Sequence, residues 1–147
     1  MRPRRAIGLM SGTSMDGIDV ALIETDGTAL RVQRSPNGFV ERLGATGYRA
    51  YSEAERALLR SALSDAEAVA GRDDRPGILP EAERMITQAH GEAVEAFLAE
   101  NGLAAADVDV IGFHGQTVLH RPDEKLTVQI GDGGALADRL GIPVVYD

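Results

Sequence analysis

The 147-residue sequence contains no cysteine, which excludes disulfide bonds and thiolate metal sites and fits a reducing compartment such as the cytoplasm. It also lacks any apolar run near the roughly 20 residues that a membrane-spanning helix needs. Basic residues are few, with 15 Lys and Arg against 23 Asp and Glu and a net charge of −8. Nucleic acids and anionic membranes select clustered basic residues, so we expect neither as a partner and predict a soluble, cytoplasmic protein.

Several familiar motifs are absent as well. The first glycine-rich segment is not followed by Gly-Lys-Ser/Thr and does not contain Gly-x-Gly-x-x-Gly, which excludes a Walker loop and a dinucleotide fingerprint there. No Gly-x-Ser-x-Gly elbow occurs, so we reject a hydrolytic triad of Ser14, Asp16 and His114. An anionic ligand must therefore be held locally, by backbone donors and a metal, rather than by the overall charge of the protein.

A glycine-bounded, hydroxyl-rich turn near the N-terminus is the most informative feature present. Gly12 and Gly17 lack a Cβ, so main-chain N–H groups can approach an anion closely, while Thr13 and Ser14 add hydroxyl donors. Apolar segments on both sides predict a strand, a tight turn and a returning strand. The pattern indicates a backbone cradle for phosphate, although a simple β-hairpin turn is the alternative that spacing alone favours.

Two blocks of this sequence resemble the anhydro-N-acetylmuramic acid kinase family. Residues 8–19 read Gly-Leu-Met-Ser-Gly-Thr-Ser-Met-Asp-Gly-Ile-Asp, which is similar to the opening of that family. Residues 112–122 contain His-Gly-Gln-Thr, and residues 127–133 contain Gln-Ile-Gly-Asp, similar to a second family segment and its continuation. Both blocks occur in the family's order, which makes an accidental match very improbable.

The resemblance implies ATP and Mg²⁺ as cofactors. It also implies that the first block contacts phosphate and that the second block lines part of the sugar-binding site. Asp16 or Asp19 would contact Mg²⁺ through water or organise the turn, but the metal ligands stay unknown because Met10 stands where many superfamily members carry an aspartate. The cofactor-binding candidates are Gly12, Thr13, Ser14, Met15, Asp16, Gly17, Ile18 and Asp19, and the substrate-binding candidates are His114, Gly115, Gln116 and Thr117.

Purely structural roles remain open for several of these residues. Asp19 could cap the turn or face solvent, His114 could be a satisfied histidine at a strand end, and Gln116 could hold a loop. Asp132 within Gly-Asp-Gly-Gly could cap a helix or help its N-terminus face an anion. His90 and His120 receive no functional role.

The periodicity predicts an α/β domain with a mixed sheet and flanking helices. A three-stranded meander opens the chain, with a tight turn at Asp26-Gly27, and the resemblance implies one lobe of the actin-like, ribonuclease H-like ATPase fold. The predicted elements are strands 6–10, 18–25 and 29–35, a loop with at most a short irregular strand over 36–51, a helix from Ser52 with a capping box to Glu55, a helix from Pro80 to Asn101, strands 108–113 and 126–130, a helix from Asp132 to Leu140, and a strand over 143–146.

The resemblance implies that residues 1–147 form the N-terminal lobe of a two-lobe sugar kinase whose second lobe is absent from this chain. The family's general base is expected a few residues beyond Asp147, so no catalytic residue is assigned and we expect the chain alone to be inactive. The implied partners are an anhydro amino sugar and ATP, and the full-length protein could form a homodimer. The alternatives are another actin-like sugar kinase or ATPase, or a non-catalytic module that binds sugar or nucleotide.

Overall fold

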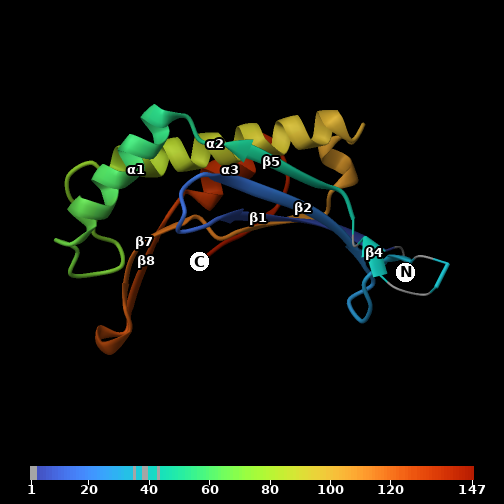
Figure 1. Ribbon diagram of the computed structural model, residues 1–147, viewed down its shortest axis with the longest axis horizontal. Coiled ribbons are helices and arrows are strands. Elements are labelled where there is room, and N and C mark those ends of the chain that lie inside the picture. The colour runs from blue at the N-terminus through green and yellow to red at the C-terminus, as the bar shows by residue number, and fades with distance from the viewer. Residues whose placement is uncertain (1–2, 35, 38–39, 43) are drawn as a thin grey trace.

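A five-stranded mixed sheet forms the centre of the computed structural model, which describes residues 3–34, 36–37, 40–42 and 44–147 (Figure 1). The strand order is β5-β2-β1-β6-β9. Strands β1 (Arg4–Ser11), β2 (Gly17–Thr25) and β5 (Thr46–Ala50) are antiparallel neighbours. Strands β6 (Val110–Phe113) and β9 (Val144–Val145) extend the sheet in parallel from β1. The predicted mixed sheet is confirmed, and its first two strands pair as the predicted meander requires.

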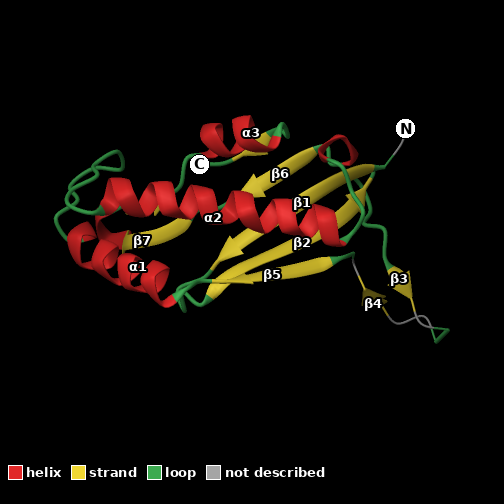
Figure 2. Ribbon diagram, turned by 90° about the horizontal axis from the view of Figure 1, so that it is seen from above, coloured by secondary structure: helices red, strands yellow, loops and turns green. Residues whose placement is uncertain are grey.

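Three helices lie on one side of this sheet, and the longest of them runs across its strands (Figure 2). They are α1 (Glu53–Ala66), α2 (Leu79–Glu100) and α3 (Gly133–Leu140). Ser52 forms the predicted capping box at the start of α1, and the Asp132 side chain caps α3 by accepting a backbone N–H. The helix boundaries therefore follow local signals that the sequence carries openly. No helix in the described part of the chain is long and apolar enough to cross a membrane.

The hydrophobic core lies between the helices and the sheet. Ile7 and Leu9 of β1 point toward the helices, and Ile86 and Phe97 of α2 meet them from the other side. On α1 the buried positions are Leu59, Ala62 and Ala66. The opposite sheet face carries small or exposed residues, namely Gly8, Met10, Ala21 and Gly112. This face is left uncovered by the three helices.

The third strand of the meander differs from the prediction. The chain does turn at Asp26-Gly27, where Thr25 and Leu30 form an isolated bridge, but it then leaves the sheet. Residues 46–50 pair with β2 instead, within the segment that was predicted as a loop. Gly47 is paired with Val20 of β2, and a Cβ there would be 2.9 Å from the Phe97 ring. Glycines that suggested a loop thus permit a strand to pass beneath α2.

Two small antiparallel ribbons leave the central sheet. Strand β3 (Gln33–Arg34) pairs with β4 (Val40–Arg42), while Ser35, the end of the predicted third strand, lies outside the described residues. Strand β8 (Leu126–Ile130) has the predicted bounds, and it pairs with β7 (Gln116–Arg121), a strand that was not among the predicted elements. The β7–β8 ribbon projects away from the helices (Figure 1).

Candidate functional site

Both motif blocks reach the same edge of the sheet. Strands β1 and β6 are parallel neighbours, with Leu9 opposite Phe113, so the chain leaves both strands at their adjacent carboxyl ends. Residues 12–16 follow β1 and residues 114–115 follow β6. Ligands of layered α/β proteins gather at such edges because loops from neighbouring strands converge there. The fold therefore brings together two segments that lie about a hundred residues apart in the sequence.

The turn at residues 12–16, here called the first turn, presents open backbone to solvent. Met15 adopts a positive φ of 51°, and its N–H donates to the Gly12 carbonyl at 3.1 Å. The amides of Thr13 and Ser14 have no acceptor among the described residues. A Cβ on Gly12 would meet only the Ser14 hydroxyl, at 3.9 Å, so space remains beside the backbone. The first turn thus offers donors and room to an anion.

Gly17 has a different reason to be glycine. A Cβ there would overlap the Tyr48 ring and approach the Arg49 carbonyl to 2.5 Å. The residue is therefore needed for packing of β2 against β5. Ile18, its neighbour, is fully buried in the core. These two cofactor-binding candidates support the first turn from behind, and any direct contact of theirs with nucleotide stays a prediction.

Two carboxylates flank the first turn. The Ser14 hydroxyl donates to Asp16 Oδ1 at 2.7 Å, and this hydrogen bond is the main reason why the pKa of Asp16 lies below its ordinary value. Asp19 is exposed on β2, opposite Met10. Within the described residues, no three His, Cys, Asp or Glu side chains gather to hold a metal ion. A Mg²⁺ ion that arrives on ATP phosphates needs only one or two protein carboxylates, and a metal contact of Asp16 or Asp19 stays a prediction.

A buried hydrogen-bond chain joins the first turn to the second block. Ser11 and Gln116 are 3% and 1% exposed, and the Ser11 hydroxyl donates to Gln116 Oε1 at 2.5 Å. Tyr51 Oη lies 2.8 Å from the same Ser11 oxygen. Gln116 Nε2 donates over 3.4 Å to the Gly12 carbonyl. Gln116 therefore holds a loop, which is the structural role left open above, and its contact with substrate stays a prediction.

The remaining residues of the second block form an exposed polar cluster. Gln129 Nε2 donates to His114 Nε2 at 2.7 Å and to Thr117 Oγ1 at 3.3 Å. His114 thus forms a hydrogen bond with Gln129 rather than with Ser14, which agrees with the rejection of a hydrolytic triad. Gly115 has a φ of +71°, and a Cβ there would lie 2.5 Å from the Ile130 carbonyl. The end of β8 therefore lies close to Gly115, and this close packing sets the shape of the cluster.

Some supporting residues were missed by sequence reasoning. Gln129 lies inside the quoted second block, so its motif position was the available signal. Ser11 likewise lies inside the quoted first block. Tyr51 gave no comparable signal, because its contact with Ser11 joins residues 40 positions apart through folding alone. His120 is exposed, as expected, and His90 is fully buried on α2.

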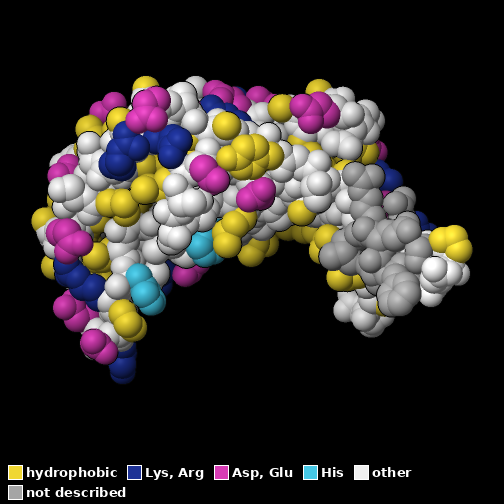
Figure 3. Space-filling view, in the orientation of Figure 1, with side chains coloured by type: hydrophobic (Ala, Val, Ile, Leu, Met, Phe, Trp, Pro, Cys, Tyr) yellow, Lys and Arg dark blue, Asp and Glu magenta, His cyan; other side chains and the backbone are white. Residues whose placement is uncertain are grey.

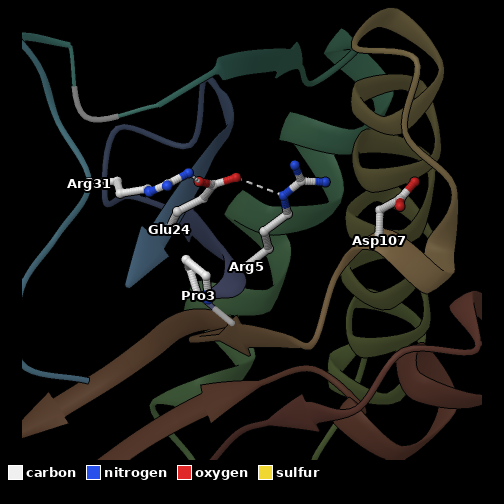
Figure 4. A pocket seen from close by; sticks show the side chains of 5 residues that line it. All are labelled: Pro3, Arg5, Glu24, Arg31 and Asp107. Atoms are coloured by element: carbon white, nitrogen blue, oxygen red, sulfur yellow. Dashed lines mark hydrogen bonds and ion pairs between the residues drawn. The ribbon is translucent and has the colours of Figure 1, made fainter. Parts of the chain in front are cut away.

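Cavities lie both beside this edge, where Gln129 helps to line one, and away from it. One of about 250 Å³ is lined by Pro3, Arg5, Glu24, Arg31 and Asp107 at the amino end of β1, where the Arg5 and Glu24 side chains point toward one another (Figure 4). The face away from the helices is also hollowed, with the β7–β8 ribbon along one side (Figure 3). The candidate site is consequently a pair of open turns at the rim of this hollowed face rather than an enclosed pocket.

Comparison with known proteins decides the family. The family model described as anhydro-N-acetylmuramic acid kinase matches residues 4–147. The chain belongs to this family. It is 67% identical over 147 residues to the anhydro-N-acetylmuramic acid kinase of Methylorubrum populi. The aligned region is all of this chain and 39% of that relative. It is 68% identical over 143 residues to that of Methylobacterium nodulans, covering 97% of this chain and 38% of the relative.

A third family member extends the same pattern. The anhydro-N-acetylmuramic acid kinase of Rhodopseudomonas palustris strain BisB18 is 61% identical over 142 residues, covering 97% of this chain and 36% of the relative. The chain therefore spans less than two fifths of the length of these curated family members. What it contains is the pair of turns, the helical layer behind them and the buried hydrogen bonds that join them.

Proposed function

We propose that this chain works as the N-terminal lobe of a two-lobe, ATP-dependent anhydro-N-acetylmuramic acid kinase. The observation that carries the proposal is the meeting of both motif blocks at one sheet edge, joined by the Ser11–Gln116 hydrogen bond. Membership of the family supports the substrate class. We further propose that the protein is cytoplasmic and takes part in peptidoglycan recycling. We also propose that the full-length protein forms a homodimer. Here, full-length protein means this chain continued to the length of its relatives.

The proposed reaction couples ring opening to phosphoryl transfer. Water adds to the anomeric carbon C1 and loses a proton to a general base, the bond from C1 to O6 breaks, and O6 forms a bond to the γ-phosphorus while ADP leaves. The product is N-acetylmuramic acid 6-phosphate. The general base is proposed to lie in the part of the full-length protein beyond Asp147.

The residues of this chain have distinct proposed roles. The open amides of Thr13 and Ser14, with the hydroxyls of both residues, bind phosphate oxygens, and the missing Cβ of Gly12 leaves room for them. Asp16 or Asp19 would contact the Mg²⁺ ion through water, or organise the turn, and the ion would neutralise phosphate charge when bound with ATP. The exposed cluster around His114 and Thr117 binds sugar hydroxyl and amide groups, for which its mixture of donors and acceptors is suited.

A coupled ADP-release assay tests the proposal. The full-length protein and residues 1–147 are compared with anhydro-N-acetylmuramic acid present and absent. We expect sugar-dependent ADP release from the full-length protein only. ADP release that depends on a different sugar would favour another actin-like kinase. Sugar binding without turnover by the folded full-length protein would favour a non-catalytic module, and turnover by residues 1–147 would contradict the division of labour between lobes.

A further inference from the structure

Tyr51 is a buried polar residue that belongs to neither motif block. It lies between β5 and the Ser52 cap of α1, and only 5% of its surface is exposed. Burial is the main reason why the pKa of Tyr51 is raised to about 12, so the hydroxyl keeps its proton at neutral pH. A buried hydroxyl normally has a hydrogen-bond partner, and here that partner is Ser11 at the end of β1.

The donor and the acceptor of each hydrogen bond among Tyr51, Ser11 and Gln116 can be deduced by starting from Gln116. Gln116 Oε1 can only accept, so the Ser11 hydroxyl donates to it and thereby uses its single hydrogen. The Tyr51 hydroxyl must then donate to Ser11. Every group in this arrangement is neutral, and each of the two hydroxyls has one defined acceptor. The three side chains consequently have one favoured arrangement, which changes if any one of them is removed.

Tyr51 also contacts the first turn through its backbone. Its N–H donates to the Asp16 carbonyl at 2.8 Å, at the end of the turn. Its hydroxyl reaches Ser11, the residue before the turn. At the other end of these hydrogen bonds, Gln116 Nε2 donates to the Gly12 carbonyl. The first turn is thus held at both ends by contacts that lead to Tyr51 and to the 114–117 segment.

We propose that Tyr51 is a positioning residue that, acting through Ser11 and Gln116, holds the first turn and the 114–117 segment in one fixed relation. This inference rests on the proposed function, which assigns phosphate to the first turn and sugar to the 114–117 segment. Transfer requires O6 to lie within reach of the γ-phosphorus, and small misplacements of reacting groups reduce rates strongly. Tyr51 contacts neither ligand, and its effect on both passes through the shared hydrogen-bond chain.

The test compares Y51F, S11A and the double variant in the full-length protein. Calorimetry measures binding of Mg²⁺ with a non-hydrolysable ATP analogue, and binding of anhydro-N-acetylmuramic acid. Loss of one buried hydrogen bond corresponds to about a 3- to 10-fold effect, so we expect Y51F to weaken both affinities by that factor. The double variant should bind no more weakly than S11A alone, because Tyr51 acts through Ser11. Weakening of only one ligand, or additive losses in the double variant, would overturn the proposal.

Y48F is the matched control. Tyr48 lies on β5, three residues before Tyr51, is 57% exposed, and its hydroxyl makes no hydrogen bond among the described residues. We expect Y48F to bind both ligands as the wild type does. An equal loss in Y48F and Y51F would show that the effect is not specific to the buried hydroxyl. Thermal unfolding of every variant identifies those that fail to fold, and binding is compared among folded variants.

Hydrogen exchange separates this inference from the proposed function. Y51F should speed amide exchange in both residues 12–16 and residues 114–117, whether or not sugar is the substrate. If the wild-type protein neither binds the sugar nor releases ADP, the proposed function fails while this result still supports the positioning role. Unchanged exchange in either segment contradicts the positioning role, whatever the substrate proves to be.

Discussion

The two ends of β1 satisfy their polar groups in opposite ways. At the amino end, Arg5 and Arg31 both pair with Glu24, at 2.8 and 3.1 Å. At the carboxyl end, Ser11 and Gln116 form a neutral buried chain, and the turn beside it leaves amides open. Ion pairs at a partly exposed position are screened by salt, whereas neutral buried hydrogen bonds depend on geometry. The amino end is thus tethered by ion pairs, whereas the carboxyl end has the fixed geometry that the proposed ligand placement requires.

The largest effect should come from the backbone of the carboxyl end. Gly115→Ala adds a Cβ at a φ of +71°, where it would lie 2.5 Å from the Ile130 carbonyl. We expect the free energy of unfolding to fall by about 2–4 kcal/mol. Gly112→Ala is the control on the preceding strand, because its nearest contact would be 3.9 Å away. Chemical denaturation should show a change within about 0.5 kcal/mol there. Equal costs at the two glycines would refute the special geometry of Gly115.

The next effect is a pH dependence near the carboxyl end of β6. His90 packs edge-on against Phe113, with ring centroids 4.9 Å apart, and its Nδ1 lies 2.7 Å from the Ile86 carbonyl. Burial, aided by the charge of Arg49, lowers the pKa of His90 from 6.5 to about 4. The unfolded chain therefore binds an extra proton between these values, so stability is full above pH 6.5 and falls as pH drops toward 4.

The loss at His90 has a defined upper size and a simple control. A shift of this kind corresponds to a stability loss of at most about 3 kcal/mol between the two pH values. In His90→Leu, this part of the acid sensitivity should vanish, as measured by denaturation at pH 7, 5.5 and 4. A variant with the same slope as the wild type over that range would show that another group titrates there.

A smaller effect is expected at the ion-paired amino end. Glu24→Gln removes both pairs with Arg5 and Arg31, whose side chains are 38% and 72% exposed. Such exposed pairs contribute about 0.5–1 kcal/mol, and the difference from wild type should shrink in 1 M NaCl, where the Debye length is about 3 Å. Nucleotide affinity should not change. A salt-independent loss, or weaker nucleotide binding, would remove the contrast between the two ends.

The smallest effect concerns the exposed surface of the first turn. Ser14→Ala deletes the hydroxyl that donates to Asp16 and is the main cause of its lowered pKa. We expect the Asp16 carboxyl to titrate at higher pH in the variant, measured by carbon-detected NMR, with no measurable change in unfolding. An unmoved titration would show that the backbone amides, rather than Ser14, dominate the environment of this carboxylate.

Local signals predicted much of this fold, and long-range packing decided the rest. Ser52 and Asp132 begin helices as their capping patterns predict, because both capping contacts lie within three residues. Strand β5 could not be predicted in the same way. The close approaches of Phe97 to Gly47 and of the Leu22 backbone to Gly44 come from distant parts of the chain. Turn-forming residues therefore indicated a loop where packing made a strand.

The candidate site was likewise predictable in part from local signals and in part decided by long-range packing. The two blocks were expected at strand ends, and their meeting at one edge follows from the parallel pairing of β1 with β6. Their connection through Tyr51 could not be foreseen, because an aromatic residue before a helix cap reads as an ordinary core residue. Its function in this account depends on one oxygen that lies 2.8 Å from Ser11.

The most direct test of the two-ended account is an NMR titration of ¹⁵N-labelled residues 1–147 with Mg²⁺-ATP. The account predicts that amide shifts concentrate at residues 12–17 and spread to residues 114–117. Residues around Glu24 and Arg31 should keep their positions. Shifts confined to the arginine-lined amino end, with residues 12–17 unmoved, would contradict the assignment of phosphate to the first turn.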